Sequence, residues 1–282
     1  MSRTTARGKW VVCFITLVGL CSGGAGTAAA QPGTKTSPEK ENPYFVTYTD
    51  ELEDRGELEL ELLATGGPAC CNSGGYVAPW LELEYGVTSW WTTELYLEGV
   101  HIADDGSAFT GWRSENRFRL FKGEHAVNPI LYIEYEDINE ASRIQKEIVG
   151  SGPLPRGPIA LLKEQHAREL EGKLILSSDI GPWNVAENAI VEKNFSEEEG
   201  VEFGYAVGVS RTIGRWVVGA EAYGGLGSTI ETTLSDTRQF IAPIVGWRPP
   251  GGNSFVHVSI GFGLTDASDS YVLRVGYSVT LR

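Results

Sequence analysis

Apolar and polar residues alternate strictly near the end of the chain. From 271 to 281 every second residue is Tyr, Leu or Val, and the positions between them are mostly small or polar. The stretch 255–264 repeats this alternation. Because successive side chains of a β-strand point to opposite faces, both stretches are predicted to be strands. An apolar face set against a small and polar one is typical of a membrane β-barrel.

The same alternation recurs upstream, with short turn-like stretches between the runs. Such connections between alternating runs indicate antiparallel hairpins. We therefore predict an all-β fold, a transmembrane antiparallel up-and-down β-barrel of about 12 strands, the even number that such barrels carry. The expected strands are 55–63, 77–85, 91–99, 111–120, 130–136, 169–177, 183–193, 201–209, 216–223, 239–247, 255–264 and 271–281.

The connections between these strands alternate in length. With both ends of the barrel in the periplasm, the outer loops are 64–76, 100–110, 137–168, 194–200, 224–238 and 265–270. The inner turns are 86–90, 121–129, 178–182, 210–215 and 248–254. Longer outer loops are the usual asymmetry of outer-membrane barrels. The longest loop includes a helix candidate at 159–166, and three placements stay open for it: inside the lumen, over the mouth, or free.

The N-terminus has the order of a secretory signal. Arg3, Arg7 and Lys9 precede an apolar run at 10–20, and small residues at 28–30 form a cleavage site. A transmembrane anchor is the alternative, but the run is shorter than the ~20 residues that a span needs. We expect a signal peptide at 1–30, a polar leader at 31–42 and an outer-membrane barrel at 43–282.

The charge of the chain limits its partners. The formal net charge is −14, and loss of the signal's three cations, with no acids, leaves −14 less three, or −17. Phosphate binding needs a basic face, so nucleic acid is not expected as a partner. The expected partners are outer-membrane lipid and a small-molecule solute, and the oligomeric state stays open.

Ionisable residues collect on the strand face opposite the large apolar residues. In a soluble sandwich this would be the solvated face; in a barrel the same residues line a wet lumen, where acids and bases pair across the interior. We favour the lumen, and its excess of acids would favour cations. The predicted lumen-lining residues are Glu59, Glu82, Glu94, Glu98, Arg113, Glu115, Arg117, Arg119, Glu134, Glu171, Lys173, Glu202, Glu221 and Arg274.

Aromatic residues stand near many of the predicted strand ends. Tyr and Trp at these positions form the interfacial girdles of membrane proteins, whereas in a soluble protein they would be core or rim residues. The expected girdle residues are Tyr85, Trp90, Trp91, Trp112, Trp183, Trp216, Trp247 and Tyr271.

The mature chain offers few ligands for a metal. Cys70 and Cys71 are adjacent in a glycine-rich loop, where they form a vicinal disulfide or remain two thiols. His101, His125 and His166 are scattered over loops. No metal site and no cofactor are predicted.

One pair of residues suggests an enzyme. His257 and Ser259 share a strand face, similar to the His-x-Ser of outer-membrane lipid hydrolases such as the outer-membrane phospholipase and lipid A deacylase, where His activates Ser for acyl transfer. Those sites face the lipid. Here the apolar neighbours Val258 and Ile260 would take the lipid face, so the pair points into the lumen and catalysis is not expected.

Several segments carry a family resemblance. They are Glu-Tyr-Gly-Val-Thr at 84–88, Trp-Thr-Thr-Glu-Leu-Tyr at 91–96, Asn-Pro at 128–129, Tyr-Ile-Glu-Tyr-Glu at 132–136, Leu-Glu-Gly-Lys-Leu-Ile-Leu-Ser at 170–177, Gly-Leu-Thr-Asp-Ala-Ser-Asp at 263–269 and Arg-Val-Gly-Tyr at 274–277. From residue 42 onward the chain resembles the Gram-negative outer-membrane barrels named for the meta-pathway of phenol degradation. The resemblance implies a barrel without catalytic residues, with a transport role for hydrophobic or aromatic compounds. One departure is the C-terminus, Leu281-Arg282, where such barrels end on an aromatic residue.

Three functional hypotheses follow. The first is an outer-membrane channel or transporter-like protein with an acidic lumen for small solutes, and no catalysis. The second is a barrel enzyme that acts on lipid through His257 and Ser259. The third is a structural barrel with a closed lumen.

Overall fold

A computed structural model describes residues 41–68, 75–123, 125–144, 157–196, 200–230 and 236–281. The predicted signal peptide, almost all of the polar leader and the Cys70–Cys71 pair lie outside these residues. Among the described residues, no helix has both the length and the apolar character to cross a membrane.

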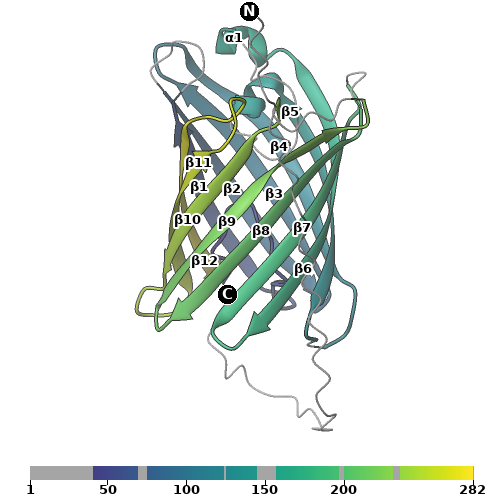
Figure 1. Cartoon of the computed structure of the whole chain (residues 1–282), viewed down its shortest axis with the longest axis vertical. Helices are drawn as coiled ribbons and strands as arrows, with labels where there is room; N and C mark the ends of the chain where they lie inside the picture. The colour runs from purple at the N-terminus through teal and green to yellow at the C-terminus, as the bar shows by residue number, and fades with distance from the viewer. Residues whose placement is uncertain are drawn as a thin grey trace, which may run out of the picture. The chain divides into compact units, whose positions relative to one another are not determined.

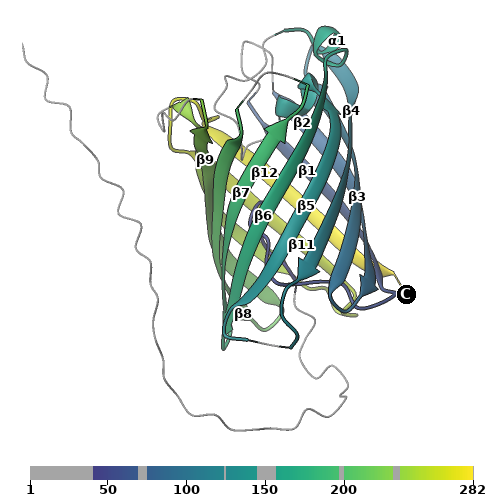
Figure 2. The same cartoon turned by 90° about the vertical axis from the view of Figure 1, so that its right-hand side faces the viewer.

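Twelve antiparallel strands close into a barrel, which confirms the predicted fold class (Figures 1 and 2). Each strand pairs with its neighbours in sequence, and β1 closes the barrel by pairing with β12. The strands are β1 (Leu58–Gly67), β2 (Tyr76–Thr88), β3 (Trp91–Ile102), β4 (Gly106–Arg119), β5 (Asn128–Asn139), β6 (His166–Ile180), β7 (Trp183–Asn194), β8 (Glu202–Ile213), β9 (Trp216–Ser228), β10 (Gln239–Trp247), β11 (Ser254–Gly263) and β12 (Tyr271–Leu281).

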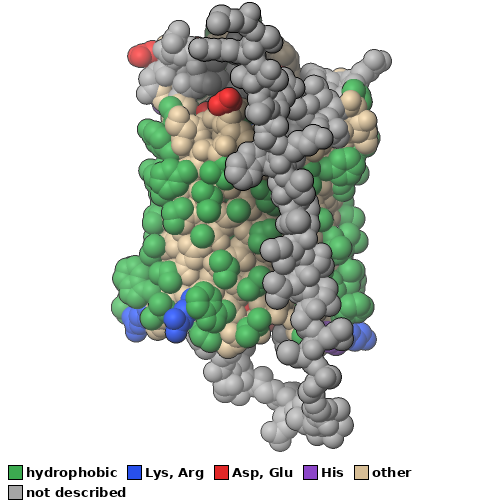
Figure 3. Space-filling view, viewed as in Figure 1, with side chains coloured by type: hydrophobic (Ala, Val, Ile, Leu, Met, Phe, Trp, Pro, Cys, Tyr) green, Lys and Arg blue, Asp and Glu red, His purple; other side chains and the backbone are tan. Residues whose placement is uncertain are grey.

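The period-2 pattern of the sequence sets the two faces of this wall. At the seam between β1 and β12, Leu60 stands opposite Val279, and the next position places Glu61 opposite Ser278. Apolar side chains therefore fall in register on the outer face, where Leu62 is 50% and Tyr277 is 40% exposed. Figure 3 shows hydrophobic side chains spread over the barrel wall, with Lys and Arg at its lower end. A wall of this kind matches lipid rather than water.

The barrel has two unlike rims. We call the rim where β1 begins and β12 ends the lower rim, and the opposite one the upper rim (Figure 1). Tight turns join β2 to β3, β6 to β7 and β8 to β9 at the lower rim, and two of them place Gly181 and Gly214 at φ 63°, a conformation that favours glycine. By the usual asymmetry of loop length, the lower rim is the periplasmic one.

Most of the predicted girdle residues lie at the lower rim. Trp216 and Trp247 have ring centroids 6.1 Å apart at the ends of β9 and β10, and Trp90 and Trp91 lie 6.4 Å apart at the start of β3. Trp112, in contrast, lies on the outer face of β4, well above that rim. The girdle is thus best developed on the predicted periplasmic side.

The upper connections differ from the prediction in two places. The expected loop 100–110 is a tight turn, because β3 runs to Ile102 and β4 begins at Gly106. In the expected loop 137–168, β5 and β6 extend the wall, and the rest includes the 3₁₀ helix η1 (Glu140–Ile144) and the short helix α1 (Ile159–Leu162). Ile159 and Leu162 pack with Ala141 against inward residues at the upper ends of β2 and β3. The described flanks of this loop therefore close over that side of the mouth.

The first strand begins three residues later than the predicted 55–63. The wall begins only at Leu58. Residues 41–54, which we call the luminal segment, run inside the barrel, as the purple trace in Figure 2 shows. Tyr44, Val46 and Thr47 are at most 3% exposed. The sequence did not indicate this position, because these residues have no strict alternation and their contacts lie far away in sequence.

Candidate lumen site

The predicted lumen residues lie on the inner face of the barrel. Eleven of the fourteen are buried or half-buried on β1–β6 and form charged groups at different heights. Glu202 lies at the upper end of β8, and Glu221 and Arg274 lie across the lumen on β9 and β12. The structure therefore brings the acids and bases of distant strands together, rather than leaving them on a solvated face.

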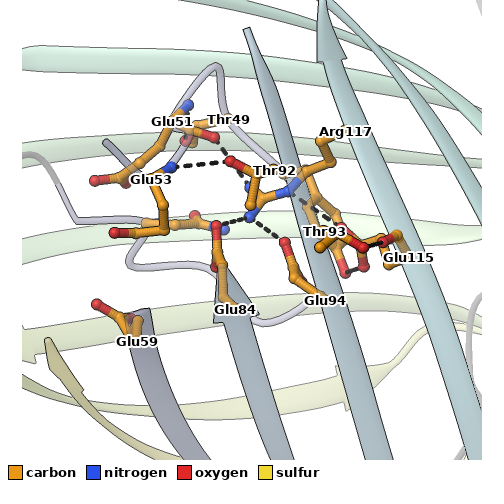
Figure 4. Close-up of polar contacts among 12 residues, drawn as sticks. Thr49, Glu51, Glu53, Glu59, Glu84, Thr92, Thr93, Glu94, Glu115 and Arg117 are labelled. Atoms are coloured by element: carbon orange, nitrogen blue, oxygen red, sulfur yellow. Dashed lines mark hydrogen bonds and ion pairs between the residues drawn. The ribbon is translucent and has the colours of Figure 1, made fainter. Parts of the chain in front are cut away.

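The lowest charged group centres on Arg117 of β4 (Figure 4). Its guanidinium pairs with Glu84 of β2 and Glu94 of β3, and its Nε lies 3.1 Å from Glu115. Its Nη1 also donates a hydrogen bond of 3.0 Å to the main-chain oxygen of Glu51 in the luminal segment. Three carboxyl groups from three strands therefore share one guanidinium.

A second charged group lies higher, around Arg113. Its Nε is 2.5 Å from Glu98 and 3.7 Å from Glu136, and its Nη1 is 3.6 Å from Glu134. Arg113 and Arg117 are four residues apart on one strand, so their side chains share the inner face at successive levels. The acids again outnumber the base.

The third and fourth bases each lie beside an aromatic ring. Lys173 on β6 pairs with Glu171 at 2.8 Å, and its ammonium lies 3.9 Å from the ring centroid of Tyr132. Arg274 on β12 lies 4.0 Å from Glu221 and 5.0 Å from the ring centroid of Tyr223. Cations over ring faces are attracted by the ring quadrupole, which helps to hold these charges away from water.

The luminal segment crosses between these groups. At one end Phe45 stacks on the His257 ring of β11, with centroids 4.1 Å apart. At the other end Asp50 accepts a hydrogen bond of 2.8 Å from Asn128 of β5, and its main-chain oxygen accepts one of 2.9 Å from Arg119. The segment thus reaches from β11 to the far wall, and it occupies the lower half of the lumen.

A cavity of about 100 Å³ remains between the luminal segment and the wall of β1–β4, β11 and β12. It has room for several water molecules. The charged residues that line it are Glu41, Glu51, Glu53, Glu59, Glu61, Glu82, Glu84, Glu94, Arg117 and His257. Burial, with Glu59 and Glu57 nearby, raises the pKa of Glu53 to about 8, so this carboxyl resists ionisation at neutral pH.

Two groups of carboxylates are close enough to share a metal ion. Their oxygens lie within 4.8 Å of one another, in the sets Glu82, Glu84, Glu94 and Glu136, Glu169, Glu192. In the first set Arg117 already supplies a positive charge to Glu84 and Glu94, and in the second Glu136 lies close to Arg113.

The His257–Ser259 pair points into the lumen, as its neighbours predicted. His257 is 2% and Ser259 is 4% exposed, whereas Val258 between them is 42% exposed on the outer face. The ring nitrogens of His257 lie 3.1 Å from the main-chain oxygen of Pro43 and 3.1 Å from Glu61. His257 therefore links the luminal segment to β1 and β11, and both of its ring nitrogens have partners other than Ser259.

Several residues of this site were not anticipated from the sequence. Asn188 of β7 and Tyr48 of the luminal segment both make luminal contacts. His257 was expected to face the lumen, but not to hold the luminal segment. One signal was available: Pro43-Tyr44-Phe45-Val46-Thr47-Tyr48 is an apolar and aromatic run without the alternation found in the rest of the chain. Such a run, placed before the first regular strand, indicates burial somewhere other than the wall.

Comparison with solved structures places the fold. The crystal structure of the COG4313 outer membrane channel from Pseudomonas putida F1 matches with a TM-score of 0.57 at 13% identity, covering 82% of this chain and 98% of that one. The NanC porin matches with a TM-score of 0.51 at 9% identity, covering 79% and 100%. The fold is that of an outer-membrane β-barrel. No protein-family model and no curated protein matches the sequence, so the likeness is one of fold.

Proposed function

We propose that the protein is an outer-membrane channel for small solutes, with an acidic lumen that favours cations. The observation that carries the proposal is the cavity beside the luminal segment, where eight glutamate side chains face one guanidinium and one imidazole. A pathway lined by one sign of charge concentrates ions of the opposite sign. Two structural relatives, a channel and a porin, support conduction as the general role.

In this conformation the luminal segment lies across the lumen, from His257 of β11 to Asn128 of β5. Conduction therefore requires the segment to move. Its described contacts with the wall are hydrogen bonds, ring contacts and apolar packing, and the pairing of β1 with β2 and β12 begins at Leu58. Removal of the segment from the lumen leaves every strand pair of the wall in place, so the barrel itself need not open.

Planar-bilayer recording on the refolded full-length protein tests the proposal. In a KCl gradient we expect channel events whose reversal potential shows a preference for K⁺ over Cl⁻. Glu59→Gln combined with Glu82→Gln removes two acids from the cavity and should reduce that preference. Glu164→Gln, at an exposed position near the upper rim, is the matched control. A preference for Cl⁻, or one that the double variant does not change, would contradict an acidic path.

A closed structural barrel is the second candidate. The observation in its favour is that charged groups around Arg113 and Arg117, together with the luminal segment, occupy the lumen at successive levels. Val46→Asp distinguishes the two, because it places a charge at a position that is 3% exposed in an apolar cluster and should drive the segment out. If this variant folds but conducts no ions at any voltage, the structural role replaces the channel.

We also infer a distant relationship to the barrels named for the meta-pathway of phenol degradation. The motifs that support it fall on the β2–β3 and β11–β12 hairpins and on β5 and β6. Such a relationship favours aromatic solutes, and the acidic cavity favours cationic ones. Proteoliposome swelling should therefore be faster with benzylammonium than with benzoate. Equal rates, or faster swelling with benzoate, would count against this choice of solute.

A further inference from the structure

The wall holds the luminal segment largely by its main chain. The carboxylate of Glu221 on β9 accepts hydrogen bonds from three successive N–H groups, those of Phe45 at 3.3 Å, Val46 at 3.1 Å and Thr47 at 2.9 Å. Such charge-assisted bonds are stronger than bonds between neutral groups. They depend on the peptide backbone, which every non-proline residue supplies.

A second wall residue binds both main-chain groups of a single residue. The side-chain oxygen of Asn188 on β7 accepts a 2.6 Å hydrogen bond from the N–H of Tyr48, and its amide nitrogen donates a 2.9 Å bond to the Tyr48 carbonyl. The Asn188 amide thus makes the two hydrogen bonds to the Tyr48 main chain that a neighbouring β-strand would make. His257 adds a contact of 3.1 Å between its Nδ1 and the Pro43 carbonyl.

Between these polar contacts, the wall has recesses for large side chains. Tyr44 packs with Ala186 and Ile244, and a Cβ atom on Gly208 would lie 2.6 Å from the Tyr44 ring. A glycine is therefore needed at 208 for the ring to fit. Val46 lies in an apolar cluster with Tyr223 and other wall residues. The recesses select aromatic and branched side chains in alternate positions.

We propose that this wall is a peptide-binding site whose resident ligand is residues 43–48, and that a free peptide of the same aromatic character binds there when the resident is displaced. Glu221, Asn188 and His257 bind the peptide main chain, and the recesses around Gly208 and Val46 select its side chains. This goes beyond conduction, because binding requires access to the lumen and no through-path.

The test uses full-length protein refolded in detergent and a fluorescein-labelled peptide with the sequence of residues 42–52, and it measures fluorescence anisotropy. Val46→Asp protein should release its resident segment and bind the peptide about tenfold more tightly than the wild type, the equivalent of ~1.4 kcal/mol. A scrambled peptide should not bind. Tyr48→Ala displaces the resident by a different contact and serves where Val46→Asp does not fold, as judged by a heat-dependent gel shift.

A second substitution in the displaced background locates the site. Asn188→Leu should weaken peptide binding about tenfold, because both main-chain bonds to Tyr48 are lost. Glu187→Gln, at the preceding residue of the same strand, whose side chain is exposed on the outer face, should leave peptide binding unchanged. Folded protein that does not bind the peptide, that binds the scrambled peptide equally, or that is unaffected by Asn188→Leu overturns the proposal. Ion conductance is measured separately, so either proposal can fail without the other.

Discussion

The ammonium of Lys173 lies 4.3 Å from the ring centroid of Tyr48, which joins a cation of the wall to an aromatic ring of the luminal segment. The Arg117 guanidinium lies 5.6 Å from the same ring, and the Tyr48 hydroxyl donates a hydrogen bond of 3.0 Å to Glu115. Burial, with Glu115 and Glu94 nearby, raises the pKa of Tyr48, so the hydroxyl keeps its proton. One side chain thus contacts two bases and one acid of the wall.

Truncation of Tyr48 should therefore loosen the luminal segment. We expect Tyr48→Ala to weaken its docking by about 2 kcal/mol through lost packing and cation–π contacts, and Tyr48→Phe, which loses only the hydroxyl, by about 1 kcal/mol. The measurement is the rate at which a glutamate-specific protease cleaves at Glu51 and Glu53. Cleavage at the exposed Glu164 serves as the internal control. Equal protection in wild type and Tyr48→Ala would show that this ring does not anchor the segment.

Removal of the base at the lowest charged group should destabilise the barrel. Arg117→Gln leaves Glu84, Glu94 and Glu115 together in the lumen without their cation, and loss of one partner from a buried ion pair costs about 3–5 kcal/mol. We expect a lower urea midpoint for unfolding in lipid vesicles. Arg215→Gln, at an exposed position in a lower-rim turn, should leave the midpoint unchanged. A midpoint for Arg117→Gln equal to that of the wild type would mean that water already screens these acids.

The wall of the barrel was predictable from the sequence because its cause is local. A strand fixes side-chain direction with a period of two, so the series Leu273, Val275 and Tyr277 identifies both the strand and its outer face. The sequence also separates the lumen face, since Arg274 falls between these residues. Strand ends were less predictable: β3 and β4 extend through the expected loop 100–110, where the polar residues of the turn also suit a hairpin.

The luminal segment was not predictable because its cause is long-range. Tyr48 meets Asn188 across 140 positions, and Thr47 meets Glu221 across 174. No spacing or motif in the sequence identifies Asn188 or Glu221 as a partner of the luminal segment. From the sequence alone, Glu221 is one of many acids expected to line the lumen. A single sequence does not show that inward side chains of β7 and β9 lie next to residues 45–48 in the lumen. Only closure of the barrel supplies this information.

Occupancy of the lumen by the segment should fall as pH rises. Glu53 has a pKa of about 8 when the segment is docked, against an ordinary value near 4.5, because burial and the carboxylates of Glu59 and Glu57 disfavour its charge, while Arg117 acts in the opposite direction. The docked state therefore binds more protons than the released state between about pH 4.5 and 8. Docking is most stable below this window and weakens as pH rises through it.

Protease cleavage of the segment at pH 5, 7 and 8.5 gives the measurement. We expect release to increase several-fold over this range in the wild type. With cleavage followed at Glu51, Glu53→Gln removes the titrating carboxyl and should flatten the profile, whereas Glu164→Gln should reproduce the wild-type curve. To correct for the protease's own pH dependence, cleavage of a short unstructured peptide is followed in parallel. Release that increases toward low pH would reverse the assigned direction.

A charge on the outer face should cost more within the apolar belt than at the rim. Val275 lies in the middle of β12, is 43% exposed and stands beside Leu273 and Tyr277 on the same face. Arginine on the lipid face of a membrane barrel costs about 2–4 kcal/mol at the bilayer midplane and about 0–1 kcal/mol near the interfaces. We therefore expect Val275→Arg to lower the free energy of unfolding in lipid vesicles by about 2 kcal/mol or more. Leu264→Arg, in the upper-rim loop, should have an effect of about 1 kcal/mol or less, because arginine there reaches water. If the two substitutions had equal effects, this part of β12 would not lie in the hydrocarbon core.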